Sequence, residues 1–281
     1  MKKTVSIVSV VAVAVVAMGM AQAKEWKEVR VATEGAYAPW NSTDASGKLI
    51  GFDIDVINEI CKRQSLKCTV QAQAWKGIIP GLTAGKYDAI IAGMQITTKR
   101  LKVIDFAGPY AKTPGSFAAM KSSPFAKFAS KLEGVTLNEV SADEQALIDQ
   151  LKAELKGKVV AVQTSTTHST FLDTFFKDIV TIRKYDTQEN VVLDMKSGRV
   201  DAAEASMSFW VPFLKKEVGK DLAMFGPSWT GDIFGFGNGI GVRKEDQDLK
   251  ATLHAGVQKI RADGTLSKLA VKWFGFDNSP K

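Results

Sequence analysis

Two stretches of this sequence, GKYDAIIAGMQ (Gly85–Gln95) and GRVDAAEASMS (Gly198–Ser208), repeat one pattern at distant places in the chain. Aligned without a gap, they share Gly, Asp, Ala, Ala and Met, and a basic residue follows each Gly. Each glycine follows a helical pattern, a position typical of a C-cap, and each aspartate begins an apolar stretch. Each copy therefore predicts a helix end, a glycine cap and a strand.

The rest of the chain alternates between strand and helix patterns. Apolar runs rich in Val, Ile and Ala predict strands at 28–33, 67–72, 87–92, 158–162, 179–183 and 200–205. Helical patterns occupy FDIDVINEICKRQS, WKGIIPGLTAG, DTQENVVLDMKSG and the C-terminal DQDLKATLHAGVQKIRADGTLSKLAVKWFG, which is divided into two helices at ADG. The third pattern opens with Asp186 three residues before Glu189, the spacing of a capping box. This alternation predicts an α/β fold with mostly parallel sheets.

Both copies of the repeat belong to a larger repeat. A strand ending in a polar loop precedes each one, VRVATEGAY before the first and KVVAVQTSTTHS before the second. Two halves thus share the order strand, loop, helix, strand, which predicts two lobes of similar build. Because ligands of open α/β sheets bind at the carboxyl ends of the strands, AGMQ and ASMS are expected to face a cleft between the lobes. Met94 and Met207 are expected in the cores, and 133–158 is expected to add a solvated helix.

The N-terminus, MKKTVSIVSVVAVAVVAMGMAQA, has the parts of a secretory signal peptide over residues 1–23. Lys2 and Lys3 precede the apolar run Val5–Met20, and the small residues Ala21–Ala23 follow it. A membrane anchor is the alternative, but the apolar run is short for one. The remainder, with 45% hydrophobic and 24% charged residues, has a globular composition. The net charge of +7 is dispersed, and export argues against nucleic acid as the partner.

The chain has two cysteines, Cys61 and Cys68, in CKRQSLKC. In an oxidising compartment an isolated pair this close is most simply a disulfide, joining the end of a helix to the following strand. A metal site would need more ligands, and the two histidines, His168 and His254, are too distant in sequence and too few to complete one. We therefore expect no metal and no cofactor.

Two segments have the chemistry of an anion site. Thr97 or Thr98 can cap a short helix whose first turn contains Arg100, an unfavourable place for a cation unless it binds an anion. The loop Ser165–Thr167 joins a strand to a helix, where free N–H groups attract anions. Arg100 from one lobe and this loop from the other would hold one carboxylate. The alternatives are a solvated arginine and ordinary N-cap residues.

Three residues that follow predicted strands could bind a cationic group. Glu34 follows this strand in TEGAYAPW and would pair with a cationic group, and Tyr37 and Trp75 would stack on a flat or cationic group. Aromatic residues at the edge of a core are the alternative for both rings. No G-x-S-x-G, HExxH or P-loop motif is present, so nothing points to catalysis.

These segments resemble one protein family. VRVATEGAYAPW, GKLIGFDIDVINEICKRQSLKC, IIPGL, YDAIIAGMQITTKR and the C-terminal helices are similar to the periplasmic solute-binding proteins for polar and basic amino acids, including lysine/arginine/ornithine-, histidine- and opine-binding proteins. The resemblance covers nearly the whole chain after the signal peptide. It implies a two-lobe type II clamshell that is monomeric, lies in the periplasm and delivers a small ligand to an ABC permease.

The resemblance also implies where the lobes divide. The first lobe is discontinuous, 24–112 plus 236–281, and the second covers 116–230. The chain crosses between them near 111–115 and 230–236. Gly231, Gly235, Gly237 and Gly239 suit a flexible crossing.

Carried over by position, the resemblance assigns a ligand site. Arg100 with Ser165, Thr166 and Thr167 would hold the ligand carboxylate. Tyr37 and Trp75 would form the aromatic sandwich around the ligand, and Glu34 would bind its distal cation. Ala92, Gly93 and Gln95 would line the strand end, where the first two leave extra room.

One position departs from the family pattern. The family usually has an acidic residue for the α-ammonium where this chain has Ser206, and Glu204 lies two residues earlier, one layer deeper in the strand. This departure favours an opine of the octopine/nopaline kind, whose α-nitrogen is substituted, over arginine or another polar or basic amino acid such as lysine, ornithine, histidine or glutamine.

Two other functions stay open as alternatives. A periplasmic enzyme resembling cyclohexadienyl dehydratases would need Glu34 or Glu204 as a general acid. A soluble sensory domain would hand its ligand to a separate sensor.

Overall fold

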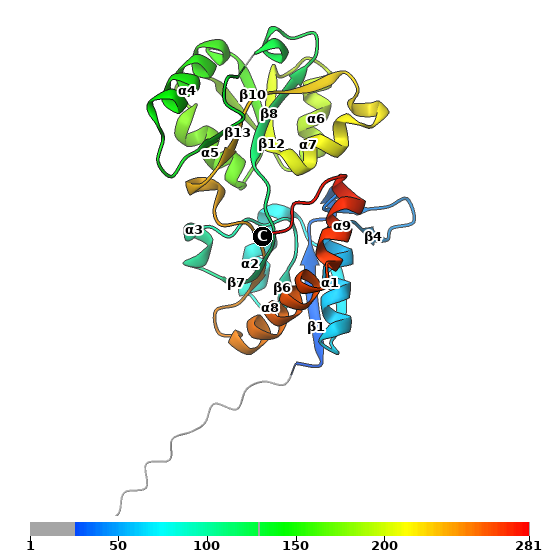
Figure 1. Cartoon of the computed structure of the whole chain (residues 1–281). Coiled ribbons are helices and arrows are strands. Elements are labelled where there is room, and N and C mark those ends of the chain that lie inside the picture. The colour runs from blue at the N-terminus through cyan, green and yellow to red at the C-terminus, as the bar shows by residue number, and fades with distance from the viewer. Residues whose placement is uncertain (1–25, 129, 281) are drawn as a thin grey trace, which may run out of the picture.

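The computed structural model describes residues 26–128 and 130–280, so the expected signal peptide lies outside the described residues. Two lobes are stacked, one above the other in the view of Figure 1, and each is built on its own sheet. No helix within the described ranges is long and apolar enough to cross a membrane.

Lobe 1, the lower lobe in Figure 1, contains a five-stranded sheet made from both ends of the chain. Its strands, in spatial order, are β5 (Lys67–Ala72), β1 (Glu28–Thr33), β6 (Ala89–Ile90), β14 (Asn238–Val242) and β7 (Asp105–Ala111). A small sheet of β2 (Ala36–Tyr37), β3 (Asn41–Thr43) and β4 (Leu49–Ile50) lies beside it. The helices are α1 (Phe52–Arg63), α2 (Ile78–Thr83), α3 (Thr98–Leu101), α8 (Gln247–Ala262) and α9 (Thr265–Phe274), with a 3-10 turn η1 (Trp75–Gly77).

Lobe 2 contains a six-stranded sheet from the middle of the chain. Its strands, in spatial order, are β11 (Thr181–Tyr185), β10 (Val159–Gln163), β12 (Ala202–Ser206), β8 (Gly115–Met120), β13 (Leu222–Thr230) and β9 (Gly134–Thr136). Its helices are α4 (Ala142–Leu155), α5 (Thr167–Phe175), α6 (Gln188–Lys196) and α7 (Met207–Leu214), with 3-10 turns η2 (Pro124–Lys127) and η3 (Glu217–Gly219). A further turn, η4 (Asp232–Phe234), lies where the chain returns to lobe 1.

Each sheet has a hydrophobic cluster on either face, as expected of a sheet covered by helices on both sides. In lobe 1 one cluster packs against α1, α8 and α9 and the other against α2. In lobe 2 one cluster packs against α4 and α5 and the other against α6 and α7. The expected α/β fold is confirmed, and the sheets are mixed, because β14, β7, β8 and β13 add antiparallel pairs.

The repeated stretch has the same structure in both lobes. Gly85 and Gly198 have φ of 72° after α2 and α6, a left-handed conformation that glycine adopts without strain. Asp88 exchanges two hydrogen bonds with the backbone of Arg30, and Asp201 does the same with Val159. Each aspartate therefore fixes its strand against the first strand of its lobe.

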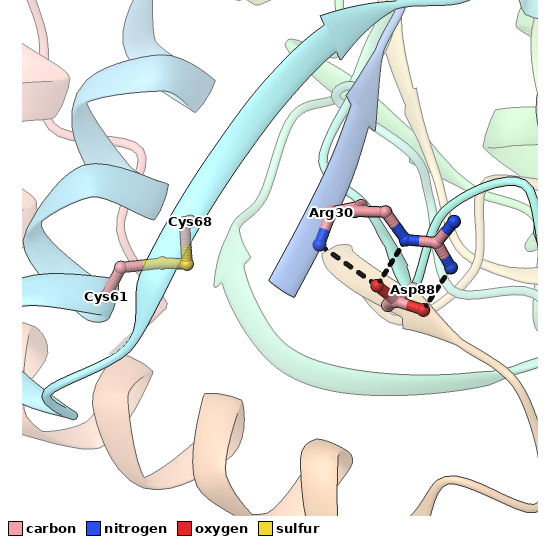
Figure 2. The surroundings of a disulfide bond; sticks show 4 residues. All are labelled: Arg30, Cys61, Cys68 and Asp88. Carbon is pink, nitrogen blue, oxygen red and sulfur yellow. Dashed lines mark hydrogen bonds and ion pairs between the residues drawn. A yellow bond between two sulfur atoms is a disulfide. The ribbon is translucent and has the colours of Figure 1, made fainter. Parts of the chain in front are cut away.

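Within the described part of the chain, Asp88 makes further bonds that Asp201 lacks. In Figure 2 the Arg30 guanidinium lies over the Asp88 carboxylate, with Nη2 2.8 Å from Oδ1. Arg243 approaches the same oxygen to 3.0 Å. These partners lower the pKa of Asp88 to about 2 against the opposing effect of burial.

The disulfide between Cys61 and Cys68 is present and joins α1 to β5, as expected (Figure 2). The two C-terminal helices and the additional helix α4 are also confirmed, and α4 begins with a capping box of Ser141 and Glu144.

Several predicted positions are wrong in detail. β6 pairs only over Ala89–Ile90, not 87–92, and β11 begins at Thr181, because Ile179 and Val180 complete a turn on Phe176. The N-cap of α6 is Thr187 rather than Asp186, since the Thr187 hydroxyl accepts the bond from the Asn190 N–H.

Of the two methionines expected in the cores, Met94 is fully buried. Met207 is the first residue of α7 and is partly exposed, because the strand ends one residue before it.

Three parts of the chain meet between the lobes (Figure 1). The chain leaves β7 for β8, it returns through η4, and the C-terminal residues run beside the first crossing, where the Lys112 N–H donates to the Asn278 carbonyl. Gly235 has a φ of 69°, and a Cβ there would lie 2.0 Å from the Ile96 carbonyl oxygen. Only glycine fits this close approach of the second crossing to lobe 1.

Candidate functional site

The strand ends of the two lobes surround a cavity of about 20 Å³. Six of the predicted site residues line it from lobe 1, namely Glu34, Tyr37, Trp75, Ala92, Gly93 and Gln95. Thr166 and Ser206 line it from lobe 2. Arg100, Ser165 and Thr167 line a second, more open cavity of about 490 Å³, which Thr166 also borders.

Hydrogen bonds between the lobes close the first cavity. The Gln163 amide donates to Glu34 at 2.6 Å, the Tyr37 hydroxyl lies 2.8 Å from the Ser206 hydroxyl, and the Trp40 indole donates to Ser208 at 3.0 Å. Because 20 Å³ is little more than one water molecule requires, a ligand the size of an amino acid fits only when these contacts separate.

Arg100 lies where the two cavities approach each other. Its Nη1 donates to the Gln95 carbonyl at 2.9 Å, its Nη2 lies 3.5 Å from the Ser165 carbonyl, and its guanidinium stacks over the Trp75 ring at 5.3 Å. Burial lowers the pKa of Arg100 to about 10, so it stays charged near neutral pH. Within the described residues no Asp or Glu forms an ion pair with it. A buried, unpaired guanidinium is suited to an anion.

The structure brings the loop Ser165–Thr167 to Arg100. Ser165 has a φ of 60°, unusual for a residue other than glycine, and its carbonyl also accepts a 3.2 Å bond from the Trp75 indole. Thr166 caps α5 by accepting from the Ser169 N–H at 3.0 Å. The Thr167 hydroxyl is buried and has no hydrogen-bond partner among the described residues. The first N–H groups of α5 also lack intrahelical partners, as in every helix.

Glu34 is a buried carboxyl in the cavity wall, with 8% of its surface exposed. Burial is the main cause that raises its pKa to about 7, and the bond from Gln163 opposes this rise. A cation beside Glu34 would favour the charged form and draw the proton off.

Tyr37 and Trp75 each stack on another side chain. The Tyr37 ring stacks on Phe209 of lobe 2, with centroids 5.4 Å apart and an interplanar angle of 8°, and Trp75 stacks on Arg100. One face of each ring is therefore already covered.

Gly93 leaves less space than the sequence indicated. A Cβ at Gly93 would lie 3.1 Å from the Trp40 indole, so this aromatic ring occupies the space beside it. Gly93 has a φ of 57°, and its carbonyl accepts a bond from Asn238.

A buried network holds this part of lobe 1 in place. Tyr110 accepts a bond from the Gly93 N–H and donates to Asp53 at 2.7 Å. Asn41 donates to Asp53 at 2.8 Å and accepts from the Gly35 N–H at 2.7 Å. Asp53 thus joins both strand-end loops of lobe 1.

Ser206 and Glu204 point into the same cavity. The sequence placed Glu204 on the same side of its strand as Ser206 but one layer deeper, and it left open whether Glu204 reaches the cleft. In the structure Glu204 lines the cavity together with Ser206. Glu204 is fully buried, and its Oε2 lies 2.7 Å from His168 Nδ1.

Five cavity residues were not assigned a ligand-binding role from the sequence: Trp40, Thr113, Gln163, His168 and Gln188. Gln163 is the last residue of β10, just as Thr33, which precedes Glu34, is the last residue of β1. The rule that ligands bind at the carboxyl ends of strands identified Glu34, and it would also have identified Gln163. Trp40 and His168 carry no such signal, since a single aromatic or histidine residue is more often part of a core.

The chain belongs to the bacterial extracellular solute-binding proteins, family 3, whose family model matches residues 29–276. It is 40% identical to an octopine-binding periplasmic protein of Rhizobium meliloti, over 94% of this chain and 96% of the relative. It is 36% identical to a histidine-binding periplasmic protein of Salmonella typhimurium, over 89% of each chain.

Solved structures of similar proteins share the fold. A Salmonella typhimurium periplasmic binding protein described for its high arginine specificity has a TM-score of 0.74 and 28% identity, covering 88% of this chain and 99% of its own. An ancestral amino acid-binding protein described as a precursor of cyclohexadienyl dehydratase has a TM-score of 0.68 and 26% identity, covering 88% and 95%. The fold is thus that of a type II periplasmic binding protein, and the curated relatives are binding proteins.

Proposed function

We propose that this protein binds an opine of the octopine/nopaline kind, or an arginine-like amino acid, in the periplasm and delivers it to an ABC permease. The main support for the proposal is the set of charged side chains that line the two cavities. The buried guanidinium of Arg100, which has no acidic partner among the described residues, borders the second cavity, and two buried carboxyls, Glu34 and Glu204, line the adjoining first cavity. This set is complementary to a ligand that carries a carboxylate and two cationic groups, as arginine and arginine-derived opines do.

In this proposal each predicted residue has one role. Arg100 and the loop Ser165–Thr167 bind the carboxylate, and the unpartnered Thr167 hydroxyl is available to it. Glu34 binds the distal cation. Tyr37 and Trp75 cover its flat surface, and Ala92, Gly93 and Gln95 line the strand end, where they contact the aliphatic part of the ligand.

Ser206 supports an opine over a free amino acid. A serine at this place has no charge for a primary ammonium, whereas an opine has a substituted α-nitrogen and a second carboxylate. The relative from Rhizobium meliloti that is named for octopine supports the same choice. Free arginine, lysine, ornithine, histidine or glutamine is the alternative ligand.

Ligand binding would work by closure of the two lobes, 24–112 with 236–281 and 116–230, about hinges near 111–115 and 230–236. The contacts between Glu34 and Gln163 and between Tyr37 and Ser206 would open to admit the ligand. We propose that the protein is a monomer, exported by a cleaved signal peptide over residues 1–23.

A thermal-shift panel of amino acids and opines tests the proposal. A ligand that binds only the folded chain stabilises it and so raises the melting temperature. At a ligand concentration one hundred times Kd, the added free energy of unfolding is about 2.7 kcal/mol. The largest rise is expected with octopine or nopaline, and next with arginine. If no opine or amino acid raised the melting temperature, the proposal would be wrong.

A dehydratase is a second candidate, and one observation favours it. The raised pKa of Glu34, about 7, is the property of a general acid. Turnover of prephenate or arogenate that is abolished by Glu34→Gln would support this enzyme, and absence of turnover in the unaltered protein would exclude it.

A further inference from the structure

Asp53, the second residue of α1, is a fully buried carboxyl that is not among the residues lining the two cavities. The Tyr110 hydroxyl donates to its Oδ1 at 2.7 Å, and the Asn41 amide donates to its Oδ2 at 2.8 Å. Burial raises the pKa of Asp53 to about 7, and the bonds from Tyr110, Asn41 and the Gly93 backbone oppose this rise. Both oxygens of the carboxyl group therefore accept hydrogen bonds from buried side chains of other elements.

Each of these two donors also accepts a hydrogen bond from a glycine near the ligand cavity. The Gly35 N–H donates to Asn41 Oδ1 at 2.7 Å, and the Gly93 N–H donates to the Tyr110 hydroxyl at 3.2 Å. Asn41 and Tyr110 thus act as relays, side chains that accept from a glycine of the cleft and donate to Asp53.

The two glycines belong to segments that carry predicted ligand residues. Gly35 follows Glu34, and Gly93 lies between Ala92 and the strand end at Gln95. Glu34, Ala92, Gly93 and Gln95 all line the first cavity. Because the peptide bond is planar, a hydrogen bond that holds the Gly35 N–H also restrains the backbone carbonyl of Glu34. The relays therefore restrain two segments of the cavity wall.

Glycine at position 51 allows α1 to begin against the segment that contains Asn41. Gly51 has a φ of 132°, and a Cβ there would lie 2.4 Å from the Trp40 carbonyl oxygen. The Asp53 N–H donates to the same oxygen at 2.8 Å. The backbone of Asp53 thus also holds Trp40, which lines the first cavity.

The direction of the hydrogen bonds requires an acceptor on both sides of residue 53. A peptide N–H can only donate, so each relay must accept from its glycine and donate to Asp53. A carboxylate accepts at both oxygens, whereas an amide has one acceptor and one donor. Asp53→Asn would therefore break one of the two relays and leave buried polar groups without partners.

We propose that Asp53 is a positioning residue of the ligand site. Through Asn41 it fixes where Glu34 lies. Through Tyr110 it fixes the strand end at Gly93. Because this role rests on the proposed function, in which Glu34 binds the distal cation, the Asn41 relay controls the preference for a charged distal group. The Tyr110 relay controls the affinity for every ligand.

Pairs of ligands that differ chiefly in the charge of the distal group test the inference. Citrulline is the neutral counterpart of arginine, and N-carboxyethyl citrulline is the neutral counterpart of octopine, which is N-carboxyethyl arginine. Calorimetry at pH 8, above the pKa of Glu34, would give the ratio of the two Kd values within each pair. The unaltered protein is expected to bind the charged member at least ~10-fold more tightly, as for one charge-assisted hydrogen bond.

Each relay can be removed separately. Asn41→Leu keeps a branched side chain and is expected to reduce this ratio at least ~3-fold, since residues in one hydrogen-bond network are energetically coupled. Tyr110→Phe removes only a hydroxyl and is expected to weaken both members of a pair by the same factor, at least ~3-fold, which leaves the ratio unchanged. Asp53→Asn is expected to weaken the charged ligands, and if it does not fold, the two relay variants still test the inference.

Matched variants separate positioning from stability. Asn58→Leu makes the same change on the exposed side of α1, and Tyr185→Phe removes a tyrosine–aspartate hydrogen bond outside the cavity. Both are expected to bind like the unaltered protein. Circular dichroism and the melting temperature show whether each variant is folded, and the ratio within a pair does not change through loss of stability alone.

Two results would overturn the inference. One is an unchanged ratio in folded Asn41→Leu, even with weaker binding of both ligands, because Asn41 would then have a structural role only. The other is unchanged affinity in Tyr110→Phe. Binding by the unaltered protein without a preference for charge would remove the role of Glu34 on which the inference depends. If neither pair bound the unaltered protein, the proposed function itself would fail.

Discussion

The Glu34 carboxylate and the Gln163 amide meet across the cleft at 2.6 Å, so the residue after β1 of lobe 1 is bonded to the last residue of β10 of lobe 2. These two residues occupy matching places in the repeated order of strand, loop and helix. The contact therefore joins the two halves of the repeat at the place where both halves present their strand ends.

Glu34 makes the stability of the protein depend on pH. Its pKa in the folded chain is about 7, above the ordinary 4.5, so the folded chain holds the proton more tightly. Its stabilising contribution is complete below pH 4.5 and is lost as the pH rises through about 7, by at most about 1.4 kcal/mol per pH unit. We expect Glu34→Gln to flatten the fall of the melting temperature over this range, measured by calorimetry.

In Glu34→Gln the melting temperature is still expected to fall with rising pH, but less steeply. Burial raises the pKa of Asp53 to about 7 as well, and Asp53 is unchanged by the substitution. Identical slopes in the two proteins would mean that Glu34 titrates with its ordinary pKa.

Arg100 provides a second prediction, on affinity. Arg100→Lys keeps a positive charge but removes the planar fork that matches a carboxylate and the stacking on Trp75. We expect ligands with a carboxylate to bind at least ~10-fold more weakly, as judged by calorimetry, since one charge-assisted hydrogen bond contributes about 1.5–3 kcal/mol. Arg199→Lys, at an exposed site of lobe 2, is the matched control and is expected to bind normally. Equal affinities in Arg100→Lys and the unaltered protein would contradict the role of Arg100.

The repeat allowed the arrangement of both lobes to be predicted from the sequence. Asp88 and Asp201 show why, because each bonds the backbone of the first strand in its lobe in the same way. Local signals of this kind, a glycine cap followed by an aspartate and an apolar run, survive in a single sequence. The additional bonds of Asp88 to Arg30 and Arg243 join distant segments and leave no local pattern.

The sequence predicted site residues only where they lie at the carboxyl ends of strands. Glu34, Gln95 and Ser206 follow that rule and line the cavity. Whether Glu204 reaches the cleft was left open, since strand periodicity gives the side on which it lies but not the depth of the cavity wall. That depth depends on Gly115, a neighbour on another strand, and on the crossing residue Phe234. Similarly, the Trp40 indole fills the space beside Gly93, a tertiary contact that the sequence does not display.

The disulfide gives a third prediction, on stability. Cys61 and Cys68 close a short loop, for which the chain-entropy relation gives about 2.5 kcal/mol of stabilisation. We expect urea denaturation under reducing conditions to show a free energy of unfolding lower by about that amount. The double variant Cys61→Ala/Cys68→Ala serves as the control, because its unfolding is expected to be insensitive to the reductant. An unchanged midpoint for the unaltered protein after full reduction would show that the bridge contributes nothing.

Ser206 gives the fourth prediction, on ligand choice. Ser206→Asp adds a negative charge beside Tyr37 and Glu204, in a cavity where little water can screen it. The added carboxylate would attract the primary ammonium of a free amino acid and repel the second carboxylate of an opine. We expect calorimetry to show weaker binding of octopine and stronger binding of arginine. Ser206→Asn, of similar size but neutral, is expected to leave the ratio of the two affinities near that of the unaltered protein. If Ser206→Asp and Ser206→Asn gave the same ratio, charge at this position would not decide between the ligands.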